Sequence, residues 1–581
     1  MDLYMDNNIK QTLAKIIDNM PSDWLRLTTH RLDIYNESLA KVEFLNKLES
    51  GVELDELPTA YDYIRLGHPL SCVLEWVIAK ESGLNPESVI AFSSQIMPVL
   101  AVLRANKLNG KQTQIVSASP LSELFKSVYQ YDFIQNETLD KNFEGTSIVI
   151  DGTEKGDINV ALYPGLGSVI CVNDNSAEYI KEIQHVRRRE SIAMTPQNCL
   201  TVIKAILEKS ARAIETVNAN DLTRTIQEIT SSKTKVAFSN CGLSAQYAIM
   251  MGQVHYANKK HAGKDIKFIV PPNCYGGTND QARRVAAVIN NVEIIDLPVD
   301  SGKDMVLELE RILTDVAHAD AVPFIIGEIP TNPRVEIPDL IKLRETLKKP
   351  RQTKDGKTAI EAVFNLDQTF CPNVKFFGDN GYLHDVKVIS YVSGSKFPSG
   401  GLCTAGYALA SDSASDYMDY IIDHLTLCDN TATNLQLQIL TREMPGMNER
   451  IAKAYTNTRA FVDYIHELLP KAKINFVSHE LANATFTPSV FSLDLPANNE
   501  EHKRELNHKL IRMMIEAIPT ESKHCVSYGQ LKGCYWTVPA TSTQGTTKES
   551  DKDYIVRVSV AADFDLPKHK EVFKKFVARA Y

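Results

Sequence analysis

Lys396 is the residue of this chain whose position most strongly favours chemistry. It follows an apolar segment, residues 386–392, that ends in Ser393, Gly394 and Ser395. An amine at the end of a buried strand cannot easily reach water, and burial favours its neutral form, which is a nucleophile toward carbonyl groups. We therefore predict that Lys396 forms a Schiff base, although a lysine after a strand is, taken alone, more often a solvated loop residue.

Two polar residues follow other apolar segments. Asp367 closes residues 362–366, and a carboxylate buried there is costly unless it meets a cation such as a protonated pyridine nitrogen. Asn332 follows residues 324–326 and lies between Pro330 and Pro333. Because prolines fix the chain path, we expect the Asn332 amide to be a rigidly placed hydrogen-bond donor.

Glycine-containing turns follow two further segments. Gly242 and Leu243 begin an expected helix directly after residues 236–238, so backbone N–H groups and the positive end of the helix dipole are available to a phosphate. Tyr275 precedes two glycines, and its ring is placed to lie over a flat heterocycle. Taken alone, the turn at Gly242 is better explained as an N-cap and glycine turn without a ligand, and the alternative at Tyr275 is a turn with an incidental tyrosine.

The elements that must position these residues follow a regular pattern. Short apolar segments alternate with amphipathic stretches at residues 236–238, 266–270, 292–295, 324–326, 362–364 and 386–392. This pattern predicts an α/β fold with a mostly parallel sheet covered by helices. Ligands of such sheets bind at the carboxyl ends of the strands, and an amine, a carboxylate, a ring and a phosphate-binding turn gathered there are the parts of a pyridoxal-phosphate site.

The domain organisation is predicted from changes in this pattern. We expect a PLP-binding large domain over residues 194–428 and a small α+β domain over residues 429–581. Residues 1–193 form an N-terminal region in which residues 91–100 echo residues 237–246. That echo indicates either a degenerate related unit without the glycine turn or a coincidence between two strand-turn-helix units.

The composition limits the classes of partner. The chain has 581 residues and a net charge of -9, so neither nucleic acid nor an anionic membrane is expected as its main partner. No segment reaches the roughly 18 apolar residues that span a bilayer, and the ten cysteines form no CxxC pair. We expect a cytoplasmic protein without a metal site, in which residues 187–189, three arginines, form a solvated face or a salt-bridged helix end.

Several motifs together make the chain resemble the Cys/Met-metabolism family of pyridoxal-phosphate enzymes, which includes cystathionine γ-synthase, cystathionine lyases and methionine γ-lyase. The motifs, in matching order, are Cys241-Gly242-Leu243, Tyr275-Gly276-Gly277-Thr278, Glu328-Ile329-Pro330-Thr331-Asn332-Pro333, Asp367-Gln368-Thr369-Phe370, Ser393-Gly394-Ser395-Lys396 and Arg557-Val558-Ser559-Val560. The resemblance runs from about residue 200 to the end of the sequence given. It implies the aspartate aminotransferase-like fold, fold type I, with pyridoxal 5'-phosphate as cofactor.

The resemblance also implies roles for individual residues. Lys396 would be the Schiff-base lysine, and Asp367 the partner of the pyridine nitrogen. Tyr275 would be the stacking ring and a catalytic residue, and Arg557 would bind the substrate carboxylate. The remaining cofactor contacts would come from the amides of Gly242 and Leu243, the hydroxyls of Ser393 and Ser395, and the side chain of Asn332.

A Tyr-x-Arg pair near the N-terminus extends the resemblance. The segment around Tyr63 and Arg65 is similar to the one that, in this family, a neighbouring subunit supplies to bind the cofactor phosphate. In this chain His68 replaces the asparagine of that segment. The resemblance thus implies a homodimer or homotetramer with sites shared between subunits. A plain surface loop is the alternative.

One motif departs from the family. The segment that contains Ser527 has Lys532 where cystathionine-binding enzymes have a glutamate. If both residues contact the substrate, the inverted charge favours an acidic distal group; Lys532 pointing to solvent is the alternative. We therefore expect β/γ-replacement or elimination on a sulfur-related amino acid, with γ-replacement on an activated homoserine preferred, as in transsulfuration. A carbon-sulfur lyase and a catalytically silent regulatory homologue are the alternatives.

Overall fold

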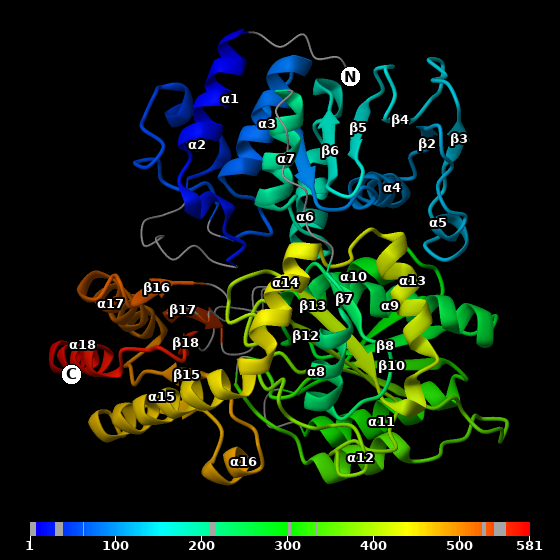
Figure 1. The fold of residues 1–581 in the computed structure, drawn as a ribbon. Coiled ribbons are helices and arrows are strands. Elements are labelled where there is room, and N and C mark those ends of the chain that lie inside the picture. Colours follow the sequence, from blue (N-terminus) through cyan, green and yellow to red (C-terminus); the bar gives the residue numbers. More distant parts are fainter. Residues whose placement is uncertain are drawn as a thin grey trace.

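The computed structural model describes residues 7–28, 39–61, 63–207, 217–299, 304–332, 334–525, 530, 532–539 and 554–581. These residues form three β-sheets, of six, seven and five strands in chain order, each accompanied by helices (Figure 1). The chain therefore has the predicted α/β architecture, with an α+β part at its C-terminal end.

The seven-stranded sheet carries most of the predicted site. Its strands are β7 (Ala237–Ser239), β8 (Ile266–Val270), β9 (Val292–Asp296), β10 (Val322–Glu328), β11 (Val363–Asp367), β12 (Val388–Ser393) and β13 (Gly406–Ala410). They lie in the order β7-β13-β12-β11-β10-β8-β9, and β13 alone is antiparallel to its neighbours. The predicted mostly parallel sheet is confirmed, and residues Glu328, Asp367 and Tyr391 lie in register at the carboxyl ends of three adjacent strands.

Helices cover both faces of this sheet because its strands are apolar on both sides. They are α8 (Asn220–Thr230), α9 (Gly242–Lys260), α10 (Gly276–Ala286), α11 (Met305–His318), α12 (Leu340–Lys348), α13 (Tyr417–Leu427) and α14 (Asn434–Glu443). Phe268, Phe324 and Ile326 pack with α9, α10 and α13 on one face. Ile269 and Ile325, which alternate with them, pack with α8, α11 and α12 on the other.

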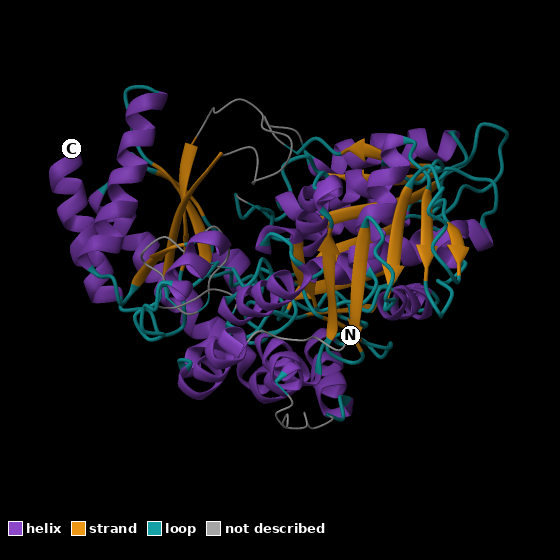
Figure 2. Cartoon of the chain, turned by 90° about the horizontal axis from the view of Figure 1, so that it is seen from above, coloured by secondary structure: helices purple, strands orange, loops and turns teal. Residues whose placement is uncertain are grey.

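The C-terminal part is a smaller α+β unit, as predicted. Its strands are β14 (Lys473–Asn475), β15 (Val490–Asp494), β16 (Ser522–His524), β17 (Gly533–Pro539) and β18 (Tyr554–Ser559). Its helices are α15 (Met447–Leu468), α16 (His479–Asn483), α17 (Glu500–Ala517) and α18 (Leu566–Ala580). The sheet order is β14-β15-β18-β17-β16, and Figure 2 shows this sheet set apart from the other two.

The N-terminal part contains the six-stranded sheet. Its strands are β1 (Val89–Phe92), β2 (Thr113–Val116), β3 (Ile134–Asn136), β4 (Thr146–Ile150), β5 (Ile158–Tyr163) and β6 (Gly167–Val172), in the order β1-β6-β5-β4-β2-β3. Its helices are α1 (Asn7–Asn19), α2 (Lys41–Glu49), α3 (Pro69–Ser82), α4 (Met97–Asn109), α5 (Leu124–Ser127), α6 (Tyr179–Arg189) and α7 (Pro196–Ile206). One continuous apolar core joins this part to the seven-stranded sheet, from Phe92 and Leu100 to Tyr247 and Phe268.

Two findings concern classes of site and location. Within the part of the chain that the structure describes, no helix combines the length and apolar character needed to cross a bilayer. The described residues also hold no group of three or more potential metal ligands.

Candidate active site

The predicted site residues from distant parts of the sequence meet in one cavity. The cavity has about 800 Å³ of space not filled by protein atoms, part of which is open solvent. It is lined by Tyr63, Arg65, Cys241, Gly242, Leu243, Gln246, Tyr275, Thr278, Glu328, Pro330, Asn332, Asp367, Thr369, Phe370, Tyr391, Ser393, Ser395, Lys396 and Arg557. All predicted cofactor contacts are therefore brought together.

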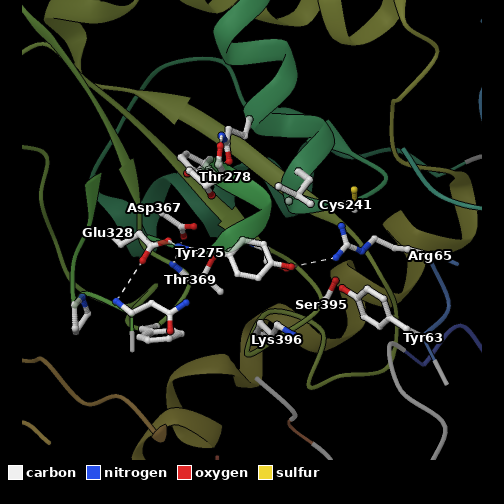
Figure 3. A pocket seen from close by; sticks show the side chains of 18 of the residues that line it. Tyr63, Arg65, Cys241, Tyr275, Thr278, Glu328, Asp367, Thr369, Ser395 and Lys396 are labelled. Carbon is white, nitrogen blue, oxygen red and sulfur yellow. Dashed lines mark hydrogen bonds between the residues drawn. The ribbon is translucent and has the colours of Figure 1, made fainter. Parts of the chain in front are cut away.

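Lys396 lies in the turn that leaves β12, and its side chain lines the cavity from below Tyr275 in Figure 3. The residue is only 7 % exposed, so the predicted burial is confirmed. Burial lowers the pKa of Lys396 to about 8, and the charge of Arg65 acts in the same direction. A substantial fraction of the amine is therefore neutral, and hence nucleophilic, near neutral pH.

Two carboxylates face the cavity from adjacent strands. Glu328 ends β10, Asp367 ends β11, and the two residues are paired in register. Burial raises the pKa of Glu328 to about 8, with a further increase from the charge of Asp367. Burial likewise raises the pKa of Asp367 to about 6, against a 2.8 Å hydrogen bond donated by the Thr369 N–H. A cation placed beside Asp367 would relieve this cost.

Glu328 has a structural partner on each oxygen. Its Oε1 accepts a hydrogen bond from the Tyr275 N–H at 2.6 Å, and its Oε2 accepts one from the Asn332 N–H at 3.2 Å. It thereby holds two cavity-lining segments in place. The sequence motifs imply no role for Glu328, although its position at a strand end, like that of Asp367, is a signal that can identify it.

Tyr275 occupies the centre of the cavity, with its hydroxyl directed toward Arg65 (Figure 3). Arg65 Nη2 donates to the Tyr275 hydroxyl at 3.2 Å, and Arg65 Nη1 donates to the Arg188 carbonyl oxygen at 2.9 Å. Burial alone would raise the pKa of Tyr275, but the charges of Arg65 and Arg189 outweigh it and lower the pKa. The guanidinium of Arg65 also lies 4.6 Å from the ring centre of Tyr63.

The origin of Tyr63 and Arg65 differs from the expectation. The resemblance implied that a neighbouring subunit supplies this pair, whereas both residues line the cavity from the same chain as Lys396. The alternative of a plain surface loop is wrong, since Arg65 is 4 % exposed. The N-terminal part can reach the cavity in cis because it shares a core with the seven-stranded sheet.

The turn at Gly242 has the predicted geometry for an anion. Cys241 caps the 19-residue helix α9, and Gly242 begins it. A Cβ at Gly242 would lie 3.0 Å from the Ser393 Cβ, which is an unusually tight contact, so glycine favours this close approach of the two segments. The approach places the amides of the helix start beside the Ser393 and Ser395 segment, where a phosphate would find donors from both.

Arg557 enters the cavity from the C-terminal unit. It lies on β18, is 5 % exposed, and its guanidinium is 5.1 Å from the ring of Phe370 and 5.0 Å from that of Trp536. These aromatic faces hold the planar group in one orientation. A planar cation so held suits a carboxylate ligand.

Lys532 is not among the described residues that line the cavity. Its Nζ lies 3.5 Å from Glu521 Oε2, and its side chain is 28 % exposed. Glu521 attracts it away because the two residues flank the paired strands β16 and β17. The reason for preferring an acidic distal group is therefore removed, and Ser527 lies outside the described residues.

The three arginines at residues 187–189 form the end of helix α6. Arg187 Nη1 contacts Glu75 Oε1 at 2.8 Å, and Arg189 Nε lies 3.9 Å from Asp280 Oδ2. Arg187 is buried, so the prediction of a salt-bridged helix end is confirmed and that of a solvated face is wrong.

The donor set fits pyridoxal phosphate. Asn332 Oδ1 is buried without a hydrogen-bond partner among the described residues, and Asp367 faces the cavity without a cation that holds its pKa down. A phosphorylated pyridine ring would supply groups for both and an anion for the start of α9. Thr278 and Thr369, which stand in two of the motifs without an assigned role, also line the cavity. Gln246 and Tyr391 line it as well, and the sequence does not identify them because nothing in their local pattern distinguishes them from core residues.

Comparisons with known proteins complete the description. No protein-family model and no curated protein sequence matches the chain. Among solved structures, the chain is similar to MetB from Corynebacterium glutamicum, with 14 % identity, TM-score 0.47, and coverage of 62 % of this chain and 84 % of that one.

Two further solved structures give similar values. CalE6, a methionine gamma lyase from Micromonospora echinospora, is 15 % identical with TM-score 0.45 and coverage of 61 % of this chain and 83 % of that one. Cystathionine gamma synthase from Xanthomonas oryzae pv. oryzae, solved with cystathionine, is 15 % identical with TM-score 0.45 and coverage of 62 % and 84 %. These neighbours are members of the Cys/Met-metabolism family of pyridoxal-phosphate enzymes, the family that the motifs of this chain resemble.

Proposed function

We propose that the chain is a pyridoxal-phosphate-dependent enzyme that performs β/γ-replacement or elimination on a sulfur-related amino acid. The observation that carries the proposal is the presence, in one cavity, of a buried amine of lowered pKa at Lys396 and a buried carboxylate of raised pKa at Asp367. The catalytically silent alternative would need neither group, and both are costly to bury.

When bound, pyridoxal phosphate would supply an electrophilic aldehyde and an electron-withdrawing ring. Lys396 Nζ is the group that would attack the aldehyde, because its neutral form is populated near pH 8. Asp367 would hold the ring nitrogen in its protonated state, because a buried carboxylate is most stable beside a cation. Tyr275 would lie against the ring.

The phosphate would be held from three directions. The amides of Gly242 and Leu243 provide donors at the start of α9, Ser393 and Ser395 provide hydroxyls, and Arg65 provides a charge. The positive end of the helix dipole acts on the same anion.

The substrate would be oriented by Arg557. Its guanidinium can bind the α-carboxylate through two parallel hydrogen bonds, and Lys396 lines the same cavity. Lys396 Nζ, once released from the cofactor, would then accept the α-proton and, in γ-chemistry, also transfer the β-proton.

The preference for γ-replacement on an activated homoserine depends on the charge of the group that meets the substrate's distal end. Because Lys532 pairs with Glu521 outside the cavity, the charge argument for an activated homoserine no longer holds. We therefore propose the broader class, in which γ-replacement of the cystathionine γ-synthase type and carbon-sulfur lysis of the cystathionine or methionine lyase type are the two members.

A product screen distinguishes the members. Purified protein would be incubated with O-succinyl-, O-acetyl- and O-phospho-homoserine, cystathionine and methionine, each with and without cysteine. A thioether formed only with cysteine indicates replacement, and a 2-oxo acid formed without a thiol indicates elimination.

The cofactor itself is tested with two lysine variants. Lys396→Ala should abolish both turnover and the borohydride-sensitive visible absorption band. Lys387→Ala, a matched control on the same segment whose Nζ instead pairs at 3.0 Å with Glu361, should keep both. A wild-type protein that stays colourless with excess pyridoxal phosphate would refute the proposed function.

A further inference from the structure

The N-terminal sheet repeats the strand order of the seven-stranded sheet. When the strands of each sheet are numbered from one in chain order, the N-terminal sheet has the order 1-6-5-4-2-3. The other sheet has the same order with one more strand inserted. The directions also agree, since β6 and β13 are each antiparallel to both neighbours while the remaining neighbours pair in parallel.

The segments that follow β6 and β13 agree residue by residue. After β6, a short 3-10 helix at Asp174–Ser176 precedes α6 and α7; after β13, one at Asp412–Ala414 precedes α13 and α14, with the same spacing at each step. α6 and α13 both begin with a tyrosine, Tyr179 and Tyr417. α7 and α14 are both capped by a threonine, Thr195 and Thr433, whose side chain accepts from the third residue of its helix. Two unrelated units would not share this spacing.

The contacts between the two parts are reciprocal. The turn after β1 meets the end of α13, where Ser94 Oγ donates to the Cys428 carbonyl oxygen at 2.8 Å. The turn after β7 meets the end of α6, where Cys241 Sγ donates to the Ser191 carbonyl oxygen at 3.7 Å. Such an exchange of equivalent contacts is the signature of a two-fold interface between like subunits.

Buried charges hold the two parts together. Arg104 of α4 forms a two-pronged ion pair with Glu190, and its Nη2 also donates to the Tyr247 hydroxyl of α9 at 3.2 Å. Arg284 of α10 contacts Glu190 at 3.4 Å. The Arg284–Glu190 contact and the Arg104–Tyr247 hydrogen bond cross between the two parts, and the continuous apolar core surrounds them, so the two parts are packed as one unit.

The N-terminal repeat has lost the groups that chemistry requires. The twelve-residue connection 394–405, which carries Lys396 between β12 and β13, is replaced by residues 164–166 between β5 and β6. Pro98 stands in the first turn of α4, where α9 has Gly242 and Leu243. The repeat therefore has neither the amine nor the anion-binding turn.

The repeat has kept the segment that reaches the other site. Arg65 precedes α3 and is held by the end of α6 and the residues that follow it. Arg65 Nη1 donates to the Arg188 carbonyl oxygen, and the Ala193 N–H donates to the Arg65 carbonyl oxygen at 3.0 Å. Its guanidinium then extends to Tyr275 on the far side of the interface.

We infer that residues 63–206 are a degenerate internal copy of the large unit that occupies the place of a second subunit, so that each chain carries one site completed in cis by Arg65. The identity of the ligand at that site rests on the proposed function. The chain is then a fused pseudo-dimer, in which the repeat takes the place that a neighbouring subunit has in enzymes with shared sites.

Co-expression of two variants with impaired cofactor sites tests the inference, with pyridoxal phosphate as the probe. Arg65→Ala should weaken cofactor binding about 10- to 100-fold, the effect of losing one charge-assisted hydrogen-bonding group, and Lys396→Ala should give no visible band. Arg65→Lys, which keeps the charge, should recover part of the affinity if the fold is intact. The two alanine variants are co-expressed and titrated by visible absorbance.

The two arrangements predict different titrations. With sites completed in cis, the mixture gives the sum of the separate curves. With sites shared between two chains, hybrid dimers restore tight binding in roughly a quarter of the sites, and that result would overturn the inference.

A crosslink tests the same inference without the cofactor. Gln130 of the repeat and Asn290 of the large unit are in contact away from the cavity, where Gln130 Oε1 accepts from the Asn290 N–H at 2.9 Å. A Gln130→Cys, Asn290→Cys variant joined by a short bifunctional thiol reagent should run as one chain on a denaturing gel, with the linked peptides found in that band. The single variants are the controls.

A covalent species of two chains would show that the repeat packs on another molecule and would also overturn the inference. Since this result does not depend on colour, it separates failure of the inference from failure of the proposed function, which a colourless wild type would show.

Discussion

Replacing Asp367 by asparagine should change the cofactor-free and the cofactor-bound protein in opposite directions. Without a cation, the Asp367 carboxylate is held in the cavity next to Glu328, and burial raises its pKa from the usual 3.8 to about 6. We predict that Asp367→Asn stabilises the cofactor-free protein and weakens binding of pyridoxal phosphate. The amide can still accept the hydrogen bond from the Thr369 N–H, so the local turn is preserved.

The size of the stabilisation follows from the pKa shift. A carboxyl group whose pKa is raised in the folded state costs nothing below its unfolded pKa, and the cost accumulates as the pH rises from about 4 to about 6. A shift of about two units corresponds to about 3 kcal/mol. Because Asp367 faces a cavity that water enters, we expect asparagine to add about 1–3 kcal/mol to the unfolding free energy at pH 7.5 and about half as much at pH 5.

Binding should respond with the opposite sign. A hydrogen bond to a charged group contributes about 1.5–3 kcal/mol, so loss of the carboxylate should weaken pyridoxal-phosphate affinity by about 10- to 100-fold. Denaturant unfolding of cofactor-free protein at pH 5 and 7.5, with a titration by visible absorbance, measures both effects.

A surface carboxylate provides the control for this prediction. Asp385 contacts Arg344 at 3.0 Å, and its hydrogen bond to Arg344 lowers its pKa, so Asp385→Asn should bring no stabilisation. A cofactor-free Asp367→Asn protein that is less stable than the wild type at pH 7.5, or that binds the cofactor as tightly, would show that the carboxylate is not the strained cofactor partner described here.

Three further predictions concern substrate, pH and specificity. Arg557→Lys should raise KM for the amino acid substrate by about 10-fold or more, because lysine cannot form the two parallel hydrogen bonds that a guanidinium makes to a carboxylate. The visible band of the bound cofactor should stay unchanged. An unchanged KM would contradict the role of Arg557 in substrate binding. In the cofactor-free protein, the reaction of Lys396 with a small aldehyde should follow a pKa near 8. Arg65→Gln should raise this pKa, because the positive charge of Arg65 favours the neutral amine. Labelling at several pH values followed by mass spectrometry measures the change in pKa, and a lower pKa would contradict the assigned effect of Arg65 on Lys396. Lys532→Ala should leave the preference between acidic and basic distal groups unchanged within about two-fold, since Lys532 pairs with Glu521; a large change in the kcat/KM ratio for two such substrates would place Lys532 in the site.

The local chemistry of the site was readable from the sequence because each part depends on a short segment. A buried strand that ends in an amine or a carboxylate, as at Lys396 and Asp367, is unusual whatever the rest of the chain does. The alternating apolar segments predicted the parallel sheet for the same reason.

The tertiary structure decided which chain segments share the cavity. Arg65 and Tyr275 are 210 residues apart, and no local pattern states whether such residues meet within one chain or between two. Lys532 is a case in which the local pattern gave the wrong contact. Its position in the motif indicated a substrate contact, but the pairing of β16 with β17 places it beside Glu521. Residue types and spacing determine what a segment can do, whereas the path of the whole chain through the core determines what it meets.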